Sequence, residues 1–360
     1  MDNKKLAITA AIAVVIIAAA AALIMTSNQG NHDEGPTYRT VTDLAGKEVQ
    51  IPDADHINRI VVLAPPLLSN VLDVVPSEKI VGVNQMAFAY SNQDILQKTF
   101  PNWKSVDTSF VTGFVVNKES LLNLKPDIIL YYGNTQIEGI EDVSVPMVDF
   151  FFMGNWDTET VTVAWDKLLR EVFQSKETGT MKAQWDAADK LASEKTKDVA
   201  SKKRVLALFM DNNGSLMASG TTGSGNDYIW SVMPKAGLEQ IDTGFAGSMA
   251  CSMEDVLKWN PDMVIVFQGS AKAILSNSIP GQDWSNVKAF KDKAIYDAPR
   301  TTYSWYVTCS DSPLMQLWMI SIAYPDLYGQ DEMKSYLSKY YKDSYGITLT
   351  DSEISSVLGY

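Results

Sequence analysis

Two twelve-residue segments of this chain, 119–130 and 254–265, align with each other without a gap. The first reads ESLLNLKPDIIL and the second EDVLKWNPDMVI, with Glu, Leu, Pro and Asp in matching places. Because proline disfavours helical geometry in the residue before it, each segment predicts a short helix, a tight corner and then a strand. A unit of this kind that occurs twice indicates two halves built on one plan.

Short apolar runs and helix-like stretches alternate around both segments. We expect a hairpin over 38–52 and a long series of strands and short helices after it. The expected strands are 59–64, 79–84, 126–132, 146–152, 204–210 and 261–267. The expected helices around them are 118–124, 226–236 and 254–259. Alternation of this type predicts a parallel sheet with helices on its faces in each half.

Residues 158–202 have helical periodicity, with an apolar stripe and a weak point at Thr178-Gly179-Thr180. They predict one long helix with one break between the two halves. The fold class is therefore α/β, with two Rossmann-like lobes joined by one long backbone helix. The expected lobes are 38–157 and 203–360, with 158–202 as the connecting helix.

The N-terminus predicts a membrane location. Two lysines, Lys4 and Lys5, precede twenty residues in which Thr9 is the only polar side chain, enough for a helix of about 30 Å. A cleaved signal usually has a shorter apolar region, so residues 1–25 are interpreted as an uncleaved transmembrane anchor, with a signal peptide as the alternative. The lysines keep that end cytoplasmic, which places the rest on the outer face of the plasma membrane. Residues 26–37 predict a flexible tether.

Composition excludes several classes of function. With 43 acidic against 30 basic side chains the formal charge is −13, so a nucleic-acid partner is not expected. The chain has two histidines, His32 and His56, and two cysteines, Cys251 and Cys309. These cannot form a His-rich metal site, and they argue against Ser-His or Cys-His catalysis. The cysteines form at most one disulfide bridge.

The order of several motifs resembles the substrate-binding proteins of the iron-complex (siderophore) and vitamin B12 ABC importers. These motifs are VTDLAGKEVQIP, IVVLAPPLLSNVL, IVGVN, the two aligned segments, and DSPLMQLWMISIAYPDLY. The resemblance extends over essentially everything after Tyr38. It implies a monomer with no cofactor of its own, which binds a metal chelate between its lobes and delivers it to a permease dimer and its ATPase. An anchor in place of a lipid-attachment cysteine looks archaeal.

The resemblance also assigns a role to two glutamates. In this family one glutamate on each lobe docks on the permease, and the matching positions are Glu119 and Glu254, each at the start of the short helix before a strand. A first-turn acidic side chain is favoured by the helix dipole in any case. Helix capping by both glutamates is therefore the alternative interpretation.

The ligand cleft is expected at the carboxyl ends of the strands, as in other open α/β folds. This nominates the loops 64–70, 85–90, 131–136, 151–156, 217–226, 268–272 and 300–311. Phe114, before the 118–124 helix, and Phe152 add further aromatic candidates. The side chains nominated as ligand-binding are Phe88, Tyr90, Tyr132, Trp156, Arg300, Tyr303, Trp305 and Tyr306. Their rings offer flat apolar walls with polar tips, which suit a bulky chelate.

Charge narrows the ligand class. Of the five arginines, only Arg300 lies in a nominated loop, whereas a highly anionic catecholate would need several guanidinium or ammonium donors. We therefore expect a neutral or weakly charged chelate, with an iron–siderophore of the hydroxamate type ahead of a corrinoid. The alternatives are a chelatase-like or redox enzyme on the same fold and a surface receptor without a transport partner. The lack of histidine in the nominated loops argues against the enzyme.

Overall fold

The structure, a computed structural model, describes residues 36–152, 157–177, 179–211, 213–220 and 227–360. Tyr38–Tyr360 forms one compact unit. None of the described helices is long and apolar enough to cross a membrane. The predicted anchor, residues 1–25, lies outside the described residues.

The first lobe contains a four-stranded parallel sheet in the order β4-β3-β7-β8. Its strands are β3 (Ile60–Val62), β4 (Ile80–Val83), β7 (Ile128–Tyr131) and β8 (Met147–Asp149). Its helices are α2 (Leu67–Val74), α3 (Met86–Ala89), α4 (Gln93–Thr99) and α5 (Lys118–Asn123). Two antiparallel pairs complete it: β1 (Tyr38–Thr42) with β2 (Glu48–Pro52), and β5 (Val111–Thr112) with β6 (Val115–Val116).

The second lobe contains a six-stranded sheet. Its strands are β9 (Arg204–Met210), β10 (Leu216–Ala218), β11 (Glu239–Gln240), β12 (Met249–Cys251), β13 (Met263–Gln268) and β14 (Ile295–Asp297). The order is β12-β10-β9-β13-β14, and β11 pairs with the start of β9. The helices before and after its strands are α8 (Asp227–Lys235), α9 (Met253–Trp259), α10 (Ala271–Leu275) and α11 (Lys288–Lys291). The prediction of α/β lobes with parallel sheets is confirmed, and β10 and β12 are the antiparallel additions.

The two sheets share one core arrangement, because β11-β9-β13-β14 repeats the order β4-β3-β7-β8. The aspartate that follows proline in each aligned segment makes the same hydrogen bond in both lobes. Asp127 Oδ2 accepts a hydrogen bond from the backbone N–H of Arg59 at 2.9 Å, and Asp262 Oδ2 accepts one from the backbone N–H of Arg204 at 2.9 Å. Each aspartate therefore fixes the start of the neighbouring strand, which explains why it recurs.

The connecting segment is two helices, α6 (Thr158–Val172) and α7 (Thr180–Thr196), so the break that the sequence predicts near Gly179 is confirmed and divides the segment in two. Gln174, just after α6, has a positive φ of 48°, and a left-handed residue at this place ends a right-handed helix. Gly179, with a φ of 70°, is the N-cap of α7. The two helices pack against each other, and Trp185 Nε1 donates to Thr162 Oγ1 at 2.8 Å. The apolar stripe of α6 joins the core of the first lobe, and that of α7 joins the core of the second.

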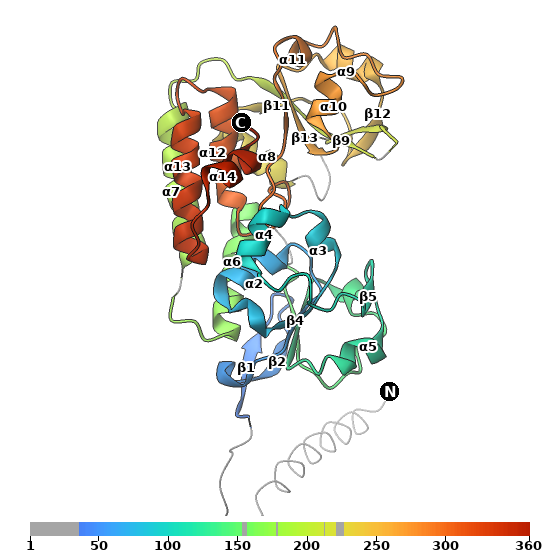
Figure 1. Cartoon of the computed structure of the whole chain (residues 1–360), viewed down its shortest axis with the longest axis vertical. Coiled ribbons are helices and arrows are strands. Elements are labelled where there is room, and N and C mark those ends of the chain that lie inside the picture. Colours follow the sequence, from blue (N-terminus) through green and yellow to red (C-terminus); the bar gives the residue numbers. More distant parts are fainter. Residues whose placement is uncertain (1–35, 153–156, 178, 212, 221–226) are drawn as a thin grey trace, which may run out of the picture. The chain divides into compact units, whose positions relative to one another are not determined.

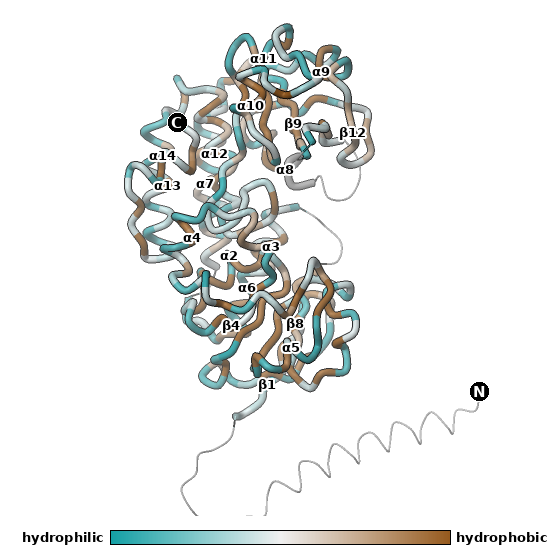
Figure 2. The backbone as a smooth tube through the Cα atoms, turned by 45° about the vertical axis from the view of Figure 1, so that its right-hand side comes forward, coloured by the Kyte–Doolittle hydropathy of each residue, from teal (hydrophilic) through white to brown (hydrophobic). Residues whose placement is uncertain are grey.

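Three C-terminal helices complete the second lobe: α12 (Ser312–Ala323), α13 (Gln330–Tyr345) and α14 (Asp351–Leu358). Every residue of α12 is buried, since this helix is apolar on most sides and packs against both α7 and α13 (Figure 1). In Figure 2 the hydrophobic residues are concentrated in the strands of both sheets. Cys251 and Cys309 are both free thiols, so they do not form the single bridge that the sequence allowed.

Candidate functional site

An aromatic pocket of about 360 Å³ opens where the carboxyl ends of the first-lobe strands face the segment after β14. We call it the cleft pocket. Its described lining comes from the loop after β3, from α3, from the β5–β6 turn, from the loop after β7, from α6 and from residues 303–308. The lining residues are Ala64, Pro65, Pro66, Met86, Phe114, Tyr132, Gln136, Val161, Trp165, Tyr303, Tyr306, Val307 and Thr308.

Tyr132 is held in place from both sides. Its ring meets Trp165 edge-on at 6.0 Å and Phe151 at 5.1 Å between centroids. Its backbone N–H donates to Gln136 Oε1 at 2.8 Å, and the next N–H, that of Gly133, donates to the Asp149 carboxylate at 2.8 Å. The loop after β7 is therefore a fixed wall, with the Gln136 carbonyl already occupied.

Tyr306 connects the pocket to the second lobe. Its ring centroid lies 5.7 Å from that of Phe267, at the end of β13, and 5.9 Å from that of Phe209, near the end of β9. Tyr90 stands edge-on to both Tyr303 and Tyr306, at 6.1 and 6.3 Å. Rings from both lobes thus form one cluster beside the pocket.

The pocket is electrically neutral over its described lining, which includes no charged side chain. Burial raises the pKa of Tyr306 to about 12, with Tyr90 adding to the effect and Arg300 opposing it. Burial likewise raises the pKa of Tyr132 and of Tyr303 above the ordinary tyrosine range. All three hydroxyls therefore keep their protons at neutral pH and can donate hydrogen bonds to a ligand.

The nominated ligand residues fall into distinct groups. Tyr132, Tyr303 and Tyr306 line the pocket, and Tyr90 lies behind two of them. Trp156 lies outside the described residues. Arg300 is partly buried and does not line the pocket, although its charge acts on Tyr306.

Trp305 and Phe88 have core positions that the loop pattern did not predict. Trp305 is 0% exposed, belongs to the second-lobe core, and donates its indole N–H to Thr301 Oγ1 at 2.6 Å. Phe88 packs on Phe100 and Trp103 of the first lobe, with ring centroids 6.2 and 5.4 Å away. Neither residue lines the cleft pocket, so both are left out of the site.

The sequence nominations also missed Trp165 and Val161 of α6. Helical periodicity correctly indicated that these side chains are buried, but burial does not reveal which side of a helix borders a cavity. The signal that could have found Trp165 is its place in a helix that joins two lobes, since ligand pockets often form between domains.

Glu119 and Glu254 occupy equivalent positions, each the second residue of its helix, and both are exposed. Neither glutamate caps its helix. Asn117 accepts from the Ser120 N–H in α5, and Ser252 forms a capping box with Asp255 in α9. Both glutamates nevertheless lie in the first turn of their helices, where the helix dipole favours an acidic side chain. Docking stays a prediction. Over the described residues, no three His, Cys, Asp or Glu side chains come together as a metal site.

Comparison with known families gives a match to the profile described as periplasmic binding protein over residues 84–302. The molybdate-binding protein MolA of Haemophilus influenzae is 28% identical over 344 residues, which cover 85% of this chain and 91% of MolA.

Solved structures of solute-binding proteins are also similar to this chain over most of its length. A periplasmic solute-binding protein of Veillonella parvula superimposes with a TM-score of 0.75 at 27% identity, over 90% of this chain and 97% of its own. MolA with bound molybdate gives a TM-score of 0.71 at 25% identity, over 87% and 99% of the two chains. Helicobacter pylori CeuE with Ni(II) bound, at 18% identity and a TM-score of 0.65 over 88% and 99%, shares the fold.

Proposed function

The chain belongs to the periplasmic binding protein family and is a substrate-binding protein of an ABC transporter, and from that premise we propose that it carries a compact, weakly charged metal chelate. The chelate is captured in the cleft pocket and delivered to the permease dimer of an importer. This is a transport role and not a catalytic one, in keeping with relatives that are solute-binding proteins.

The observation that carries the proposal is the neutral aromatic lining of the cleft pocket. Tyr132, Tyr303, Tyr306, Phe114 and Trp165 supply ring surface, and no charged side chain belongs to the described lining. Such walls suit a ligand whose organic envelope shields its metal. A ferric tris-catecholate would instead require guanidinium or ammonium donors to balance its negative charge.

Size orders the candidate chelates. The pocket volume of about 360 Å³ is at the small end of the range of ligand sites, roughly 300–1,000 Å³. A ferric hydroxamate is therefore the first candidate, and a corrinoid, which is much bulkier, is the second. Aromatic contact with the ligand envelope would supply most of the affinity, and the tyrosine hydroxyls would orient it.

Molybdate is a candidate of a different class. It is supported by the 28% identity to the molybdate-binding MolA over most of both chains. The protonated hydroxyls of Tyr132 and Tyr306, with Thr308 and the amide of Gln136, are neutral donors of a kind that can hold an oxyanion without a counter-charge. A tetrahedral oxyanion would leave much of the pocket unfilled, which is why the chelate ranks first.

Calorimetric titration of the full-length protein tests the proposal. The probes are a ferric trihydroxamate, cobalamin, a ferric tris-catecholate and molybdate, each at about 0.05 M and about 0.5 M salt. We expect one trihydroxamate per protein, with an affinity that changes little with salt because few charges are screened. Tight molybdate binding without chelate binding would replace the chelate by the oxyanion. Preference for the tris-catecholate would contradict the neutral pocket.

Anchoring by residues 1–25 remains a prediction from the sequence. Its test is the intact mass of the protein isolated from membranes of its native host. A full-length mass is expected for an uncleaved anchor, and a mature chain that starts near Thr26 or later would show that the segment is a cleaved signal.

A further inference from the structure

Phe114 differs from the other aromatic side chains that line the cleft pocket. Four of the five lining rings are each in contact with another aromatic ring. The ring of Phe114 has no aromatic partner across the described residues, and this side chain is 47% exposed. Because ring packing does not fix Phe114, its place in the pocket wall depends on the backbone that carries it.

That backbone is the tip of a very short hairpin. The strands β5 and β6 pair over two residues each and are joined by Gly113 and Phe114. Gly113 has a φ of 61°, which glycine adopts at little cost. The base of the hairpin packs into the first-lobe core through Val111 and Val116. Since a two-stranded hairpin is at best marginally stable alone, its tip needs a further attachment to hold one position.

Asn84, directly after β4, supplies this attachment. Its Nδ2–H donates to the backbone carbonyl of Gly113 at 2.8 Å, and across the described residues this is the one hydrogen bond that joins residues 112–115 to a segment outside the hairpin. Its Oδ1 accepts from the backbone N–H of Met86 at 3.0 Å. Met86 and Phe114 both line the cleft pocket, whereas Asn84 is 2% exposed and does not. One buried carboxamide therefore connects two segments of the pocket wall.

The backbone of Asn84 is fixed as well. Its N–H donates to the Val62 carbonyl of β3 at 3.1 Å, and its carbonyl accepts from the Ala87 N–H of α3 at 2.9 Å. The side chain thus extends from a rigid frame. Its position requires a donor at one end and an acceptor at the other, which asparagine offers and an ionised aspartate does not. A buried polar side chain is costly unless it is hydrogen-bonded, so the two side-chain contacts are what make asparagine suitable here.

We propose that Asn84 is a positioning residue for ligand selection, which holds the β5–β6 turn so that the Phe114 ring closes one side of the cleft pocket. The closed wall keeps the pocket near 360 Å³ and so favours a compact chelate over a bulkier corrinoid. Asn84 acts through Phe114 and does not contact the ligand. The inference rests on the proposed function, since it takes the cleft pocket as the ligand site.

The test compares a ferric trihydroxamate with cobalamin, in calorimetric titrations of the full-length protein and its Asn84→Asp variant at about pH 7.5. An ionised carboxylate still accepts from the Met86 N–H but cannot donate to Gly113, so this variant releases the hairpin tip alone. We expect trihydroxamate affinity to fall about three- to tenfold, while cobalamin affinity does not fall. An equal loss for both ligands would mean general damage to the pocket and would overturn the selection role.

Asn117→Asp is the matched control. It makes the same change of charge one residue after β6, at an exposed position. Its side-chain oxygen accepts from the Ser120 N–H at 2.8 Å, a contact that a carboxylate keeps. Both ligand affinities of this control should therefore match those of the wild type.

A double-mutant cycle shows whether Asn84 acts through Phe114. In a Phe114→Ala background, Asn84→Asp should cause no further loss of trihydroxamate affinity, because the ring that it positions is gone. The same loss in both backgrounds would show a merely structural role and would refute the proposal. If Asn84→Asp is unfolded in thermal melts, the neutral Asn84→Ala takes its place in the cycle, and its coupling to Phe114 is judged in the same way.

Acid gives a further readout, since a protonated carboxyl group regains a hydrogen-bond donor. When the pH is lowered from about 7.5 to about 4.5, the trihydroxamate affinity of Asn84→Asp should recover toward that of the wild type at the same pH. A deficit that does not change with pH would contradict the role of the Gly113 contact.

Failure of this inference is distinct from failure of the proposed function. If the wild type binds neither the trihydroxamate nor cobalamin, the proposed function fails and the inference with it. If the wild type binds the trihydroxamate and Phe114→Ala weakens that binding, but Asn84→Asp binds as the wild type does, the positioning role is refuted and the ligand site stands.

Discussion

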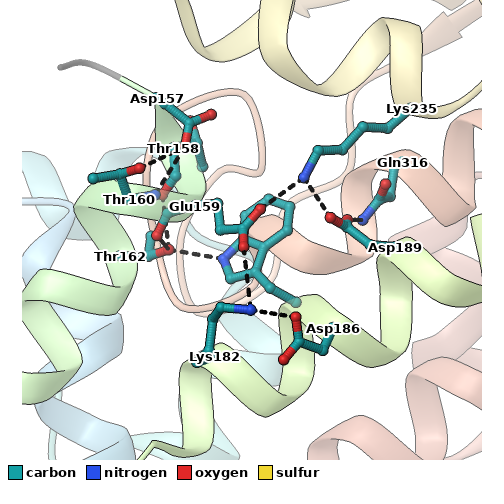
Figure 3. A network of polar contacts seen from close by, with 11 residues as sticks. Asp157, Thr158, Glu159, Thr160, Thr162, Lys182, Asp186, Asp189, Lys235 and Gln316 are labelled. Atoms are coloured by element: carbon teal, nitrogen blue, oxygen red, sulfur yellow. Dashed lines mark hydrogen bonds and ion pairs between the residues drawn. The ribbon is translucent and has the colours of Figure 1, made fainter.

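The ammonium group of Lys235 lies 2.8 Å from the Glu159 carboxylate and so ties the last turn of α8 to the first turn of α6 (Figure 3). The same group lies 2.7 Å from the Asp189 carboxylate in α7 and 4.8 Å from the ring centroid of Trp185. One second-lobe lysine therefore links both connecting helices. Its removal would leave two carboxylates near each other without their shared cation.

Replacement of Lys235 by methionine should lower the free energy of unfolding by about 1–2 kcal/mol, since the ion pairs are partly exposed and screened by water. The loss should shrink in high salt. Denaturant unfolding at low and high salt measures both effects. Lys182→Met is the control, because Lys182 also faces Glu159, at 3.7 Å, but its side chain is 50% exposed. Equal losses in the two variants would mean that the Lys235 contacts stabilise the protein no more than those of the exposed Lys182.

Phe114 is a residue whose substitution tests the ligand site without affecting the core. It lines the cleft pocket from the β5–β6 turn and is 47% exposed, so its removal should not disturb the core. Phe114→Ala should weaken binding of a ferric trihydroxamate by about 1–2 kcal/mol, the scale of one aromatic contact. Val115→Ala, which changes the neighbouring residue, 77% exposed and outside the lining, is the control. Titration calorimetry that finds both variants equal to the wild type would place the ligand elsewhere.

A buried carboxylate near the pocket should give the protein a pH-dependent stability. Asp311 is fully buried, its Oδ2 accepts from the Tyr341 hydroxyl at 2.9 Å, and its Oδ1 has no hydrogen-bond partner among the described residues. Burial raises the pKa of Asp311 to about 6. Since this is above the value of about 3.9 for an unfolded aspartate, the native state binds the proton more tightly.

The contribution of Asp311 to stability is therefore complete below about pH 4 and is lost as the pH rises through about 6. The loss amounts to about 2–3 kcal/mol. Urea unfolding between pH 4 and pH 8 should show that Asp311→Asn removes this part of the profile. Asp326→Asn, at an exposed position, should run parallel to the wild type. If the stability of Asp311→Asn also ran parallel to that of the wild type, the pH dependence would not come from Asp311.

The lobe plan could be predicted from the sequence because it depends on local signals. The run 204–210 is β9 as predicted, and the aligned segments do become helix–corner–strand units in two sheets of equal order. The break in the connecting helix was also predicted, from the weak point at Thr178-Gly179-Thr180. The apolar stripe stops at Phe173 and resumes at Met181, which predicts a break but not its exact limits; Gln174 is left-handed just after α6, and the left-handed Gly179 is the N-cap of α7.

The site was less predictable, because loop sequences reveal which rings are present but not where they point. Tyr306 and Trp305 are adjacent, yet Tyr306 lines the cleft pocket and Trp305 is fully buried in the second-lobe core. Trp305 packs in the second-lobe core and donates its indole N–H to Thr301, four residues earlier in the same segment. The residue types of 300–311 do not show which ring packs against that core and which borders the pocket.

This contrast yields a paired prediction for Trp305 and Tyr306. Trp305→Phe deletes a buried hydrogen bond and part of a core side chain, so it should lower the free energy of unfolding by about 1–3 kcal/mol. Its affinity for a ferric trihydroxamate should stay close to that of the wild type. Tyr306→Ala removes ring surface from the pocket wall, so it should weaken binding of the same chelate by about 1–2 kcal/mol. Denaturant unfolding and calorimetric titration of the same two preparations separate the effects. A Trp305→Phe protein that is as stable as the wild type but binds the chelate poorly would return Trp305 to the ligand site.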